Sequence, residues 1–310
     1  MTDCRVRITH TDGREEELSS VLSIIFTKDV YTPYTQLTLT YIDWKDNLPE
    51  DILEVKLVMW STIIHHGPID SYKVVTEHGR KRGIIISRGF TAALIENQIE
   101  PKMYLDISLN RLFDEYVTLP YIQHENNSES DYIFVKKNTP IWEAAVALAY
   151  KRTGKYPYIR NANTVMMNMP EKPAKKSYTD DLVITYGTEI MPRHLISHYH
   201  MADLDGTYGK YDYVEQEAVN RRIVRHRYFE LDRRFLNDPI KACEFRAAYA
   251  KRGFKRHFFK YSGYKFEDLN DIVTYNDIVE ERIKALKIVS NTKGLFTEIS
   301  VYKDDGFSQD

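Results

Sequence analysis

Apolar and polar residues alternate through most of the first 90 positions, with short polar turns between the alternating segments. The segment "YTQLTLTYI" places Leu37, Leu39 and Tyr41 on one face, and this period of two predicts a half-buried β-strand. The segment "SYKVVTEHGRKRGIIIS" has two apolar runs around a charged loop with glycine, which predicts a hairpin over residues 71–87. About six such strands without a helical pattern indicate a small closed barrel or sandwich. We assign residues 1–105 to a first β-barrel domain.

The pattern changes to a helical period between residues 106 and 180. In "NTPIWEAAVALAYKRTG", apolar residues recur every three or four positions, which predicts a helix with one buried stripe. Thr139 is the expected N-cap, Pro140 the expected first helical residue, and Gly154 the expected end. A shorter helix in "DISLNRLFDEYV" and a hairpin around residues 161–163 complete a small α/β unit. The stretch "EKPAKKSYTDD" lacks an apolar pattern and is predicted to be a linker.

Strand patterns return in residues 181–310, which we assign to a second β-barrel domain. The candidate strands are "LVITYG", "HLISHYH" and "YDYVEQEAV". One inserted helix is predicted in "NDPIKACEFRAAYAKRG", capped by Asn237 or Asp238 and closed by Gly253, with Cys243 on its apolar side. The last strands of "ALKIVSNTKGLFTEISVY" form a second long hairpin, which mirrors the one over residues 71–87. Two β-domains that each close on a long hairpin suggest an old duplication.

The composition narrows the class of protein without defining a function. The chain has 310 residues and a net charge of −2, so it carries no overall bias toward polyanions or membranes. Its two cysteines, Cys4 and Cys243, form neither a disulfide framework nor a metal knuckle. No segment approaches the run of about 18 apolar residues that would span a bilayer, and the first residues lack a signal-peptide pattern. We therefore expect a protein made in the cytoplasm with no membrane partner.

A histidine cluster is the first candidate for chemistry. The segment "RHLISHYHMADLDG" contains His194, His198 and His200, with Asp203 and Asp205 close behind. Imidazoles beside carboxylates can bind zinc or another first-row metal. Solvated or interface histidines explain the pattern equally well, so we expect no metal and keep the three histidines as the alternative metal site. The two aspartates could serve glycoside hydrolysis, but acidic pairs in loops are common.

Other stretches that resemble sites give weaker signals. His65 and His66 are adjacent, so in a strand they would point to opposite faces, and we predict a turn there. The stretch "SRGFTAALIENQ" begins after an apolar run, but Gly89 is its only glycine, which is too few for a phosphate-binding loop. Motifs of serine hydrolases, zinc proteases and P-loop enzymes are absent from the sequence. We therefore expect no catalytic residue and no cofactor.

The charges are unevenly distributed. Residues 221–260 contain 13 Lys or Arg against 4 Asp or Glu, with aromatic residues interleaved. This pattern is typical of a groove for single-stranded nucleic acid, in which Phe254 or Phe258 would stack on bases. A basic face that docks an acidic protein partner fits as well, and we favour it because the aromatics follow core spacing. The candidate interface residues are four arginines: Arg221, Arg222, Arg225 and Arg227.

The run "SRGFTAALIENQIEPKMYLDISLNRLFDEYV" resembles the end of the first β-domain in baseplate hub proteins of contractile phage tails. These include the late control gene D family and the hubs of prophages and phage-tail-like bacteriocins. The matching residues are Arg88, Leu94, Glu96, Asn97 and Pro101, followed by Leu109 and Phe113 in the helix. The order of elements that follows is also similar, whereas residues 187–236 match nothing in the family pattern. The resemblance places Ser87–Gln98 at a domain seam.

The resemblance implies a mainly β fold, with two small tail-tube-like barrels on either side of the α/β unit. It also implies a homotrimer in which six barrels surround a channel and join the central spike to the tail tube. The implied partners are the spike, the tube or tube-initiator protein, the tape-measure protein and baseplate wedge proteins. Assembly would take place in the host cytoplasm, and the product would be a virion or tailocin baseplate. A single-stranded nucleic-acid-binding module and a tail-associated cell-wall hydrolase remain the alternatives.

Overall fold

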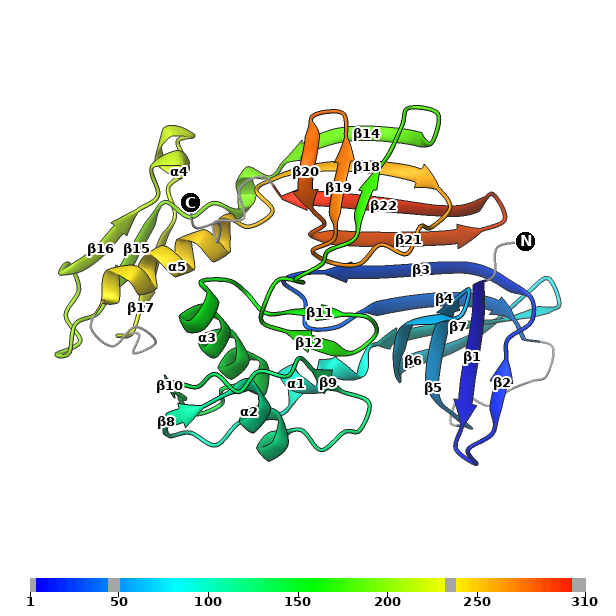
Figure 1. Cartoon of the computed structure of the whole chain (residues 1–310), viewed down its shortest axis with the longest axis horizontal. Coiled ribbons are helices and arrows are strands. Elements are labelled where there is room, and N and C mark those ends of the chain that lie inside the picture. Colours follow the sequence, from blue (N-terminus) through cyan, green and yellow to red (C-terminus); the bar gives the residue numbers. More distant parts are fainter. Residues whose placement is uncertain (1–3, 44–50, 232–237, 303–310) are drawn as a thin grey trace.

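A curled sheet of eleven strands organises the molecule (Figure 1). The computed structural model describes residues 4–43, 51–231 and 238–302. Neighbouring strands of the sheet are antiparallel throughout. In spatial order, the strands are β14 (Val183–Ile190), β18 (Lys255–Ser262), β22 (Gly294–Tyr302), β21 (Ala285–Asn291), β3 (Val21–Asp29), β4 (Gln36–Ile42), β7 (Arg80–Arg88), β6 (Thr62–Glu77), β5 (Ile52–Met59), β1 (Cys4–His10) and β2 (Glu15–Glu17).

The strand order of this sheet contains an internal repeat. We call β3, β4, β6 and β7 the first half and β14, β18, β21 and β22 the second half. When the four strands of each half are numbered along the chain, their order across the sheet is first, second, fourth, third in both halves. The two halves join where the third strand of one, β21, pairs with the first strand of the other, β3. The halves are therefore two similar four-stranded units placed side by side within one continuous sheet.

Alternation along the strands produces the two main cores. Leu37 and Leu39 are fully buried and Tyr41 is almost so, as their shared face predicts. They belong to a core formed by the first half with β1 and β5, while Phe259, Tyr261 and Ile299 belong to a separate core of the second half. Both predicted long hairpins are confirmed, as β6–β7 and as β21–β22.

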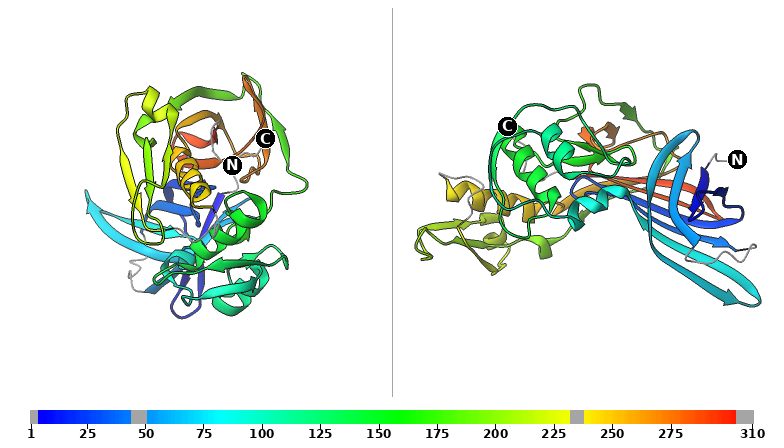
Figure 2. Two further views of the ribbon diagram at one scale, coloured as in Figure 1. Left: turned by 90° about the vertical axis from the view of Figure 1, so that its left-hand side faces the viewer. Right: turned by 90° about the horizontal axis from the view of Figure 1, so that it is seen from below.

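The α/β unit lies between the two halves in the sequence and packs beside the sheet (Figures 1 and 2). Its elements are η2 (Phe90–Ala92), α1 (Ala93–Glu96), β8 (Met103–Ile107), α2 (Leu109–Tyr116), β9 (Gln123–His124), β10 (Asp131–Phe134), α3 (Ile141–Thr153), β11 (Tyr158–Arg160) and β12 (Thr164–Met166). Both predicted helices and the predicted β11–β12 hairpin are confirmed. A third core holds the unit together, with Leu109, Leu112 and Leu148 fully buried.

The caps of α3 differ in part from the prediction. Pro140, with φ −63° and ψ 154°, is the N-cap instead of the first helical residue. The hydroxyl of Thr139 donates instead to the carbonyl of Lys136, 2.8 Å away, and so forms a tight turn before the helix. Gly154 ends the helix with φ 65°, a left-handed conformation that glycine adopts without steric cost.

The predicted linker over residues 171–181 is wrong in its central part. Residues Lys175–Ser177 form β13, which pairs in parallel with β19 (Ile272–Tyr275) and joins β20 (Ile278–Arg282) in a three-stranded sheet. The segment is held because the ring of the next residue, Tyr178, is buried against Phe259 and Tyr261. Its partner strand lies far along the chain, so the local pattern did not indicate pairing.

Residues 191–231 and 238–254 form a separate lobe at one end of the molecule (Figure 1). Its elements are η3 (Pro192–His194), β15 (His198–Met201), β16 (Tyr211–Val214), α4 (Gln216–Asn220), β17 (His226–Phe229) and α5 (Pro239–Lys251). The predicted strand "YDYVEQEAV" ends early, because Glu215 caps α4 through the backbone N–H of Glu217. The inserted helix is confirmed as α5, with Asp238 as its N-cap; Asn237 lies outside the described residues. No helix in the described part of the chain is long and apolar enough to cross a membrane.

Candidate interaction surfaces

The lobe has a covered face and an open face. Helix α5 covers one face of the three-stranded sheet β16-β15-β17, with Cys243 and Met201 fully buried between them, so the predicted core position of Cys243 is confirmed. Alternation then directs His198 and His200 of β15 to the opposite face. His226 of β17 joins them there, because it stands opposite His198 in the sheet.

Three imidazoles lie next to one another on the open face. The rings of His198 and His226 are 4.3 Å apart at 10°, and those of His226 and His200 are 5.2 Å apart at 1°. Tyr228 follows, 4.5 Å from His200 at 18°. We call His198, His226, His200 and Tyr228 the aromatic ladder. His198 and His226 overlap face to face, whereas His226 and His200 are nearly coplanar and meet edge to edge through their ring nitrogens.

Hydrogen bonds order the ladder. The two ring nitrogens of His200 contact Asp212 Oδ1 at 3.0 Å and His226 Nδ1 at 2.9 Å. His198 Nδ1 lies 2.8 Å from Ser197 Oγ. Partial burial and the neighbouring His226 and His200 imidazoles lower the pKa of His198, since a charged ring would be less well hydrated and repelled.

The structure separates the predicted histidine cluster. His194 lies in η3, outside the strand, while His198 and His200 are in the ladder. His226 was not predicted, because its place beside His198 depends on parallel strand pairing and no local motif marks it. Asp203 shapes a turn by accepting the backbone N–H groups of Asp205 and Thr207 at 3.0 and 2.9 Å. Across residues 4–43, 51–231 and 238–302, no group of three or more His, Cys, Asp or Glu is arranged to hold a metal ion.

The four candidate arginines have different environments. Arg221 contacts Glu217 at 3.4 Å and lies over the ring of Phe254, so it braces the lobe internally. Arg225 donates to the carbonyl oxygens of Arg193 and Leu195. Arg221, Arg222 and Arg227 are exposed, and Arg225 is partly buried.

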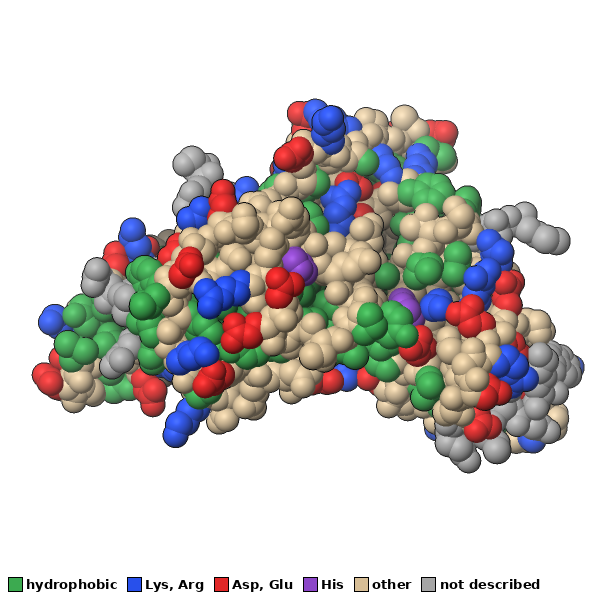
Figure 3. All heavy atoms as spheres, turned by 60° about the horizontal axis from the view of Figure 1, so that its bottom comes forward, with side chains coloured by type: hydrophobic (Ala, Val, Ile, Leu, Met, Phe, Trp, Pro, Cys, Tyr) green, Lys and Arg blue, Asp and Glu red, His purple; other side chains and the backbone are tan. Residues whose placement is uncertain are grey.

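The aromatics of the basic segment are mainly structural. Phe254 and Phe259 are 1% and 0% exposed, and Phe258 is half-buried in β18. The suggested stacking of Phe254 on bases is wrong, since its ring is enclosed in a core with Leu195 and Ala218. On the face turned forward in Figure 3, acidic, basic and hydrophobic side chains are interspersed.

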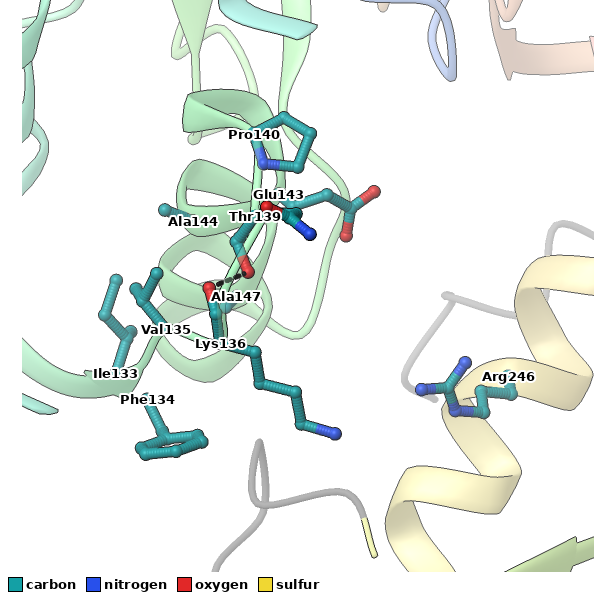
Figure 4. A pocket seen from close by; sticks show the side chains of 11 residues that line it. Ile133, Phe134, Val135, Lys136, Thr139, Pro140, Glu143, Ala144, Ala147 and Arg246 are labelled. Carbon is teal, nitrogen blue, oxygen red and sulfur yellow. Dashed lines mark hydrogen bonds between the residues drawn. The ribbon is translucent and has the colours of Figure 1, made fainter. Parts of the chain in front are cut away.

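A groove runs between the α/β unit and the lobe. It consists of three adjoining cavities of about 630, 210 and 300 Å³. Lys136 is shared by the first two and Arg246 of α5 by the last two. Figure 4 shows Lys136 and Arg246 extending toward the same space from opposite sides. The smallest cavity lies over the start of α3, where Pro140 and Glu143 line it.

The cavity of about 300 Å³ at one end of the groove is aromatic. Its walls are Tyr156 from the α/β unit together with Tyr199, Phe229, Phe245 and Tyr249 from the lobe. Arg227 lines this cavity because it stands opposite Tyr199, on the face of the sheet away from the ladder. Arg246 also lines it, with its guanidinium 4.2 Å from the centre of the Phe229 ring. The basic segment therefore places two guanidinium groups beside an apolar cavity.

A buried Ser–His pair lies at the seam between the first half and the α/β unit. Ser87 Oγ is 2.9 Å from His65 Nε2, and Thr35 Oγ1 is 2.7 Å from His65 Nδ1. All three side chains are 0% exposed, and burial lowers the pKa of His65 to about 3, with a smaller effect from His66. The imidazole is therefore neutral and enclosed, so it links two hydroxyl groups and has no access to a substrate.

The predicted turn at His65 and His66 is wrong, because both residues lie within β6. His66 points to the other face, where Nε2 is 2.9 Å from Glu54 Oε2. Nearby, a Cβ on Gly89 would lie 2.8 Å from Thr35 Oγ1 and 2.9 Å from Asn163 Oδ1. Glycine is required at this position because the β11–β12 turn approaches the first half so closely.

The curled sheet of two repeated units with an α/β insert is the fold of bacteriophage tail proteins. No family model matches the chain, and no curated protein matches its sequence. Among solved structures, the tail protein from Neisseria meningitidis is similar over 98% of both chains, with 12% identity and a TM-score of 0.70. The 43 kDa tail protein of prophage MuSo2 from Shewanella oneidensis covers 98% of this chain and 99% of its own, with 13% identity and a TM-score of 0.72.

A component of the type VI secretion system of E. coli is also similar. Its match covers 92% of this chain and 74% of its own, with 10% identity and a TM-score of 0.55. That protein is described as structurally similar to tail proteins of bacteriophage T4. At these identities the likeness concerns the fold, and it confirms the resemblance to tail proteins, the mainly β fold and the helical segments.

Proposed function

We propose that the chain is a structural hub of a contractile phage tail or tailocin baseplate, in which three copies form a ring with pseudo-six-fold symmetry. The observation that carries this proposal is the repeated strand order of the sheet. Within one chain, the third strand of the second half pairs with the first strand of the first half. Repeating the same junction between chains would pair β6 of one copy with β14 of the next. Because this contact is head to tail, it generates a ring when the rotation closes.

Both strands required for this junction have an open edge in the described part of the chain. Strand β14 ends the sheet and pairs only with β18. Strand β6 pairs with β5 over its first part, up to Pro68, and with β7 from Ile69 onward. Its second part therefore lacks a neighbour on the side away from β7, and an edge of this kind is a template for pairing with another chain.

The opposite end of the sheet is protected against such pairing. There, β2 has three residues, all glutamates, and Lys56 holds Glu15 at 2.5 Å. Strand β14 has eight residues and exposes Ile184 at 55% and Ile190 at 49%. Natural sheets blunt unwanted edges with short, charged strands. The contrast supports β14 as the edge that receives a neighbouring copy.

The proposed ring defines the roles that we assign to the chain and its partners. Three copies would contribute six four-stranded units around a channel, and residues 1–105 and 181–310 would supply one unit each. The spike would bind one end of the channel and the tail tube or its initiator the other, with tape-measure and wedge proteins as further neighbours. The chain would assemble in the host cytoplasm and remain in the baseplate. This is a structural role, and we assign the chain no catalytic residue and no cofactor.

The mass of the purified chain tests this proposal. We expect a trimer by light scattering, and a monomer when Ile184→Lys and Ile190→Lys place two cations on the β14 edge. The matched control is Leu204→Lys with Val279→Lys, at two positions that are 84% and 65% exposed elsewhere. A monomeric wild type at tens of micromolar, or a trimer that survives the β14 substitutions, would contradict the ring.

A further inference from the structure

We propose that β14 of one copy pairs with the second part of β6 of the next copy in a single register, with Thr188 opposite Val74. We also propose that this register sets residues 191–193, which we call the base of the lobe, against the seam of that next copy. The inference rests on the proposed ring and deepens it, because it names the residues through which copies meet. A trimer that used another register would keep the ring and remove these pairs, so the two can fail separately.

The repeat of strand order extends to single residues in the first strand of each half. Where β3 pairs with β4, Leu22 is an extra residue that shifts the register. Where β14 pairs with β18, Ile184 is the extra residue. A bulge of this kind pins the register of a strand. Leu22 therefore corresponds to Ile184 and, four positions further along each strand, Phe26 corresponds to Thr188.

The two long hairpins correspond in the same way. Both close on a two-residue turn, residues 78–79 in β6–β7 and residues 292–293 in β21–β22. Turns of equal length fix equal registers in the hairpins that they close. Counted back from the turns, Val74 and Ile288 therefore occupy equivalent places in the two halves.

The junction within the chain then gives the register of the junction between copies. Where β21 pairs with β3, Ile288 stands opposite Phe26. The same junction between copies places Val74 of one copy opposite Thr188 of the next. The flanking pairs on the same face of the sheet are Tyr72 with Ile190 and Thr76 with Tyr186.

The exposure of these positions fits a neighbour that a single copy lacks. Ile288 and Phe26 are 1% and 2% exposed and pack in the same core. At the place equivalent to Ile288, Val74 is 38% exposed. Ile190 is 49% exposed, whereas its equivalent, Lys28, is 5% exposed. Pairing in the proposed register would give the two apolar side chains the cover that the junction within the chain gives their equivalents.

The repeat also indicates where the lobe lies. Residues 30–35 join β3 to β4, and the lobe joins β14 to β18, so the lobe takes the place of this loop. The loop contacts the other side of the junction within the chain. The backbone N–H of Val30 donates to the carbonyl of Lys284 at 2.9 Å, and the ring of Tyr31 lies parallel to that of Tyr302 at 6.0 Å.

The equivalent contacts between copies would lie at the seam. Counted outward from the two hairpin turns, Asp70 corresponds to Lys284 and Arg88 corresponds to Tyr302. Asp70 and Arg88 are ion-paired at 2.8 Å. The base of the lobe follows β14 as the loop follows β3, so it should lie against this pair in the neighbouring copy.

Paired cysteines test the register. Val74→Cys with Thr188→Cys in one chain should give a disulfide-closed trimer on oxidation, because directly opposite strand positions lie within disulfide reach. Six strands separate β6 from β14 within a copy, so the bond must join two copies. Val74→Cys with Ile190→Cys is the control, two residues out of register, with Cβ atoms about 7–8 Å apart, and should stay unlinked. Each single variant reports any bond to Cys4 or Cys243.

A photo-crosslinker tests the base of the lobe. Arg193→p-benzoylphenylalanine, at an exposed position, should couple under light to residues 67–71 or 86–97 of the neighbouring copy. Mass spectrometry on a mixture of ¹⁴N and ¹⁵N chains separates bonds between copies from bonds within one. Leu204→p-benzoylphenylalanine, beyond the far end of β15 and 84% exposed, is the control and should not couple to these residues.

The outcomes separate this inference from the ring. Light scattering under reductant and circular dichroism show whether each variant still folds and forms the trimer. A trimer that is locked by the control pair, and not by Val74→Cys with Thr188→Cys, would keep the ring and overturn the register. Coupling of position 193 only within its own chain would overturn the placement of the lobe. A monomeric wild type would overturn the ring and the register together.

Discussion

The molecule contains two histidine groups whose environments are opposite. At the seam, His65 is fully buried and links the hydroxyls of Thr35 and Ser87. On the lobe, the rings of the aromatic ladder lie beside one another in contact with solvent, and His200 contacts Asp212. The first group has the atoms of a nucleophile and a base but no opening, while the second is open to solvent. Burial, more than residue type, therefore decides which histidines support the fold and which can meet a partner.

The largest effect expected from this comparison is on stability. His65→Ala would leave two buried hydroxyl groups without their partner and create a cavity, so the free energy of unfolding should fall by about 3–5 kcal/mol. Urea denaturation followed by circular dichroism measures it. His198→Ala on the ladder serves as the control and should cost less than about 1 kcal/mol, since that ring lies at the surface. Equal losses in the two variants would remove the distinction between the groups.

The second effect is a pH dependence that belongs to His65. Its pKa of about 3 in the folded state lies below the usual value of 6.5, so the unfolded state binds more protons between these values. Its contribution to stability is complete above pH 6.5 and is lost as the pH falls toward 3. Between pH 7.5 and 5, wild type should lose about 2 kcal/mol more than His65→Gln. His78→Asn, at an exposed turn, should keep the wild-type slope, and a His65→Gln slope as steep as wild type would contradict the assignment.

The smallest effect concerns the ladder itself. His200→Gln removes the ring that joins Asp212 to His226, yet the free energy of unfolding should change by less than about 1 kcal/mol, because exposed polar contacts contribute little. The same denaturation series provides the measurement. A loss above about 2 kcal/mol would mean that the ladder supports the lobe as His65 supports the seam.

Local sequence patterns predicted most elements of the fold but few of their pairings. Alternation at Leu37, Leu39 and Tyr41 and the helical period of α3 depend on neighbours a few residues apart, so they can be read along the chain. The pairing of β3 with β21 and of β13 with β19 joins segments far apart, and no local signal specifies it. The seam at Ser87–Gln98 was indicated by resemblance, whereas the close approach at Gly89 depends on Asn163 from a distant turn.

The candidate surfaces were predictable only in part. The charges along the chain indicated the basic segment, but which of its arginines have contacts within the lobe, as Arg221 has with Glu217, depends on the tertiary structure. No sequence pattern indicated the groove, because α3 and α5, which line it, come from separate parts of the sequence. His226 stands between arginines in the sequence, where no pattern marks it. The parallel pairing of β17 with β15 brings it beside His198.

The central pairing of the sheet also constrains how the chain can be made. Strand β3 begins at Val21 and its neighbour β21 only at Ala285, so β3 leaves the ribosome long before its partner. Until then, one edge of β3 lacks its native partner, and nascent chains on neighbouring ribosomes present the same edge. Long-range strand pairing of this kind is slow and exposes aggregation-prone surface. Slower elongation or a chaperone bound to residues 21–42 should therefore raise the yield of folded protein more than any change near the C-terminal hairpin.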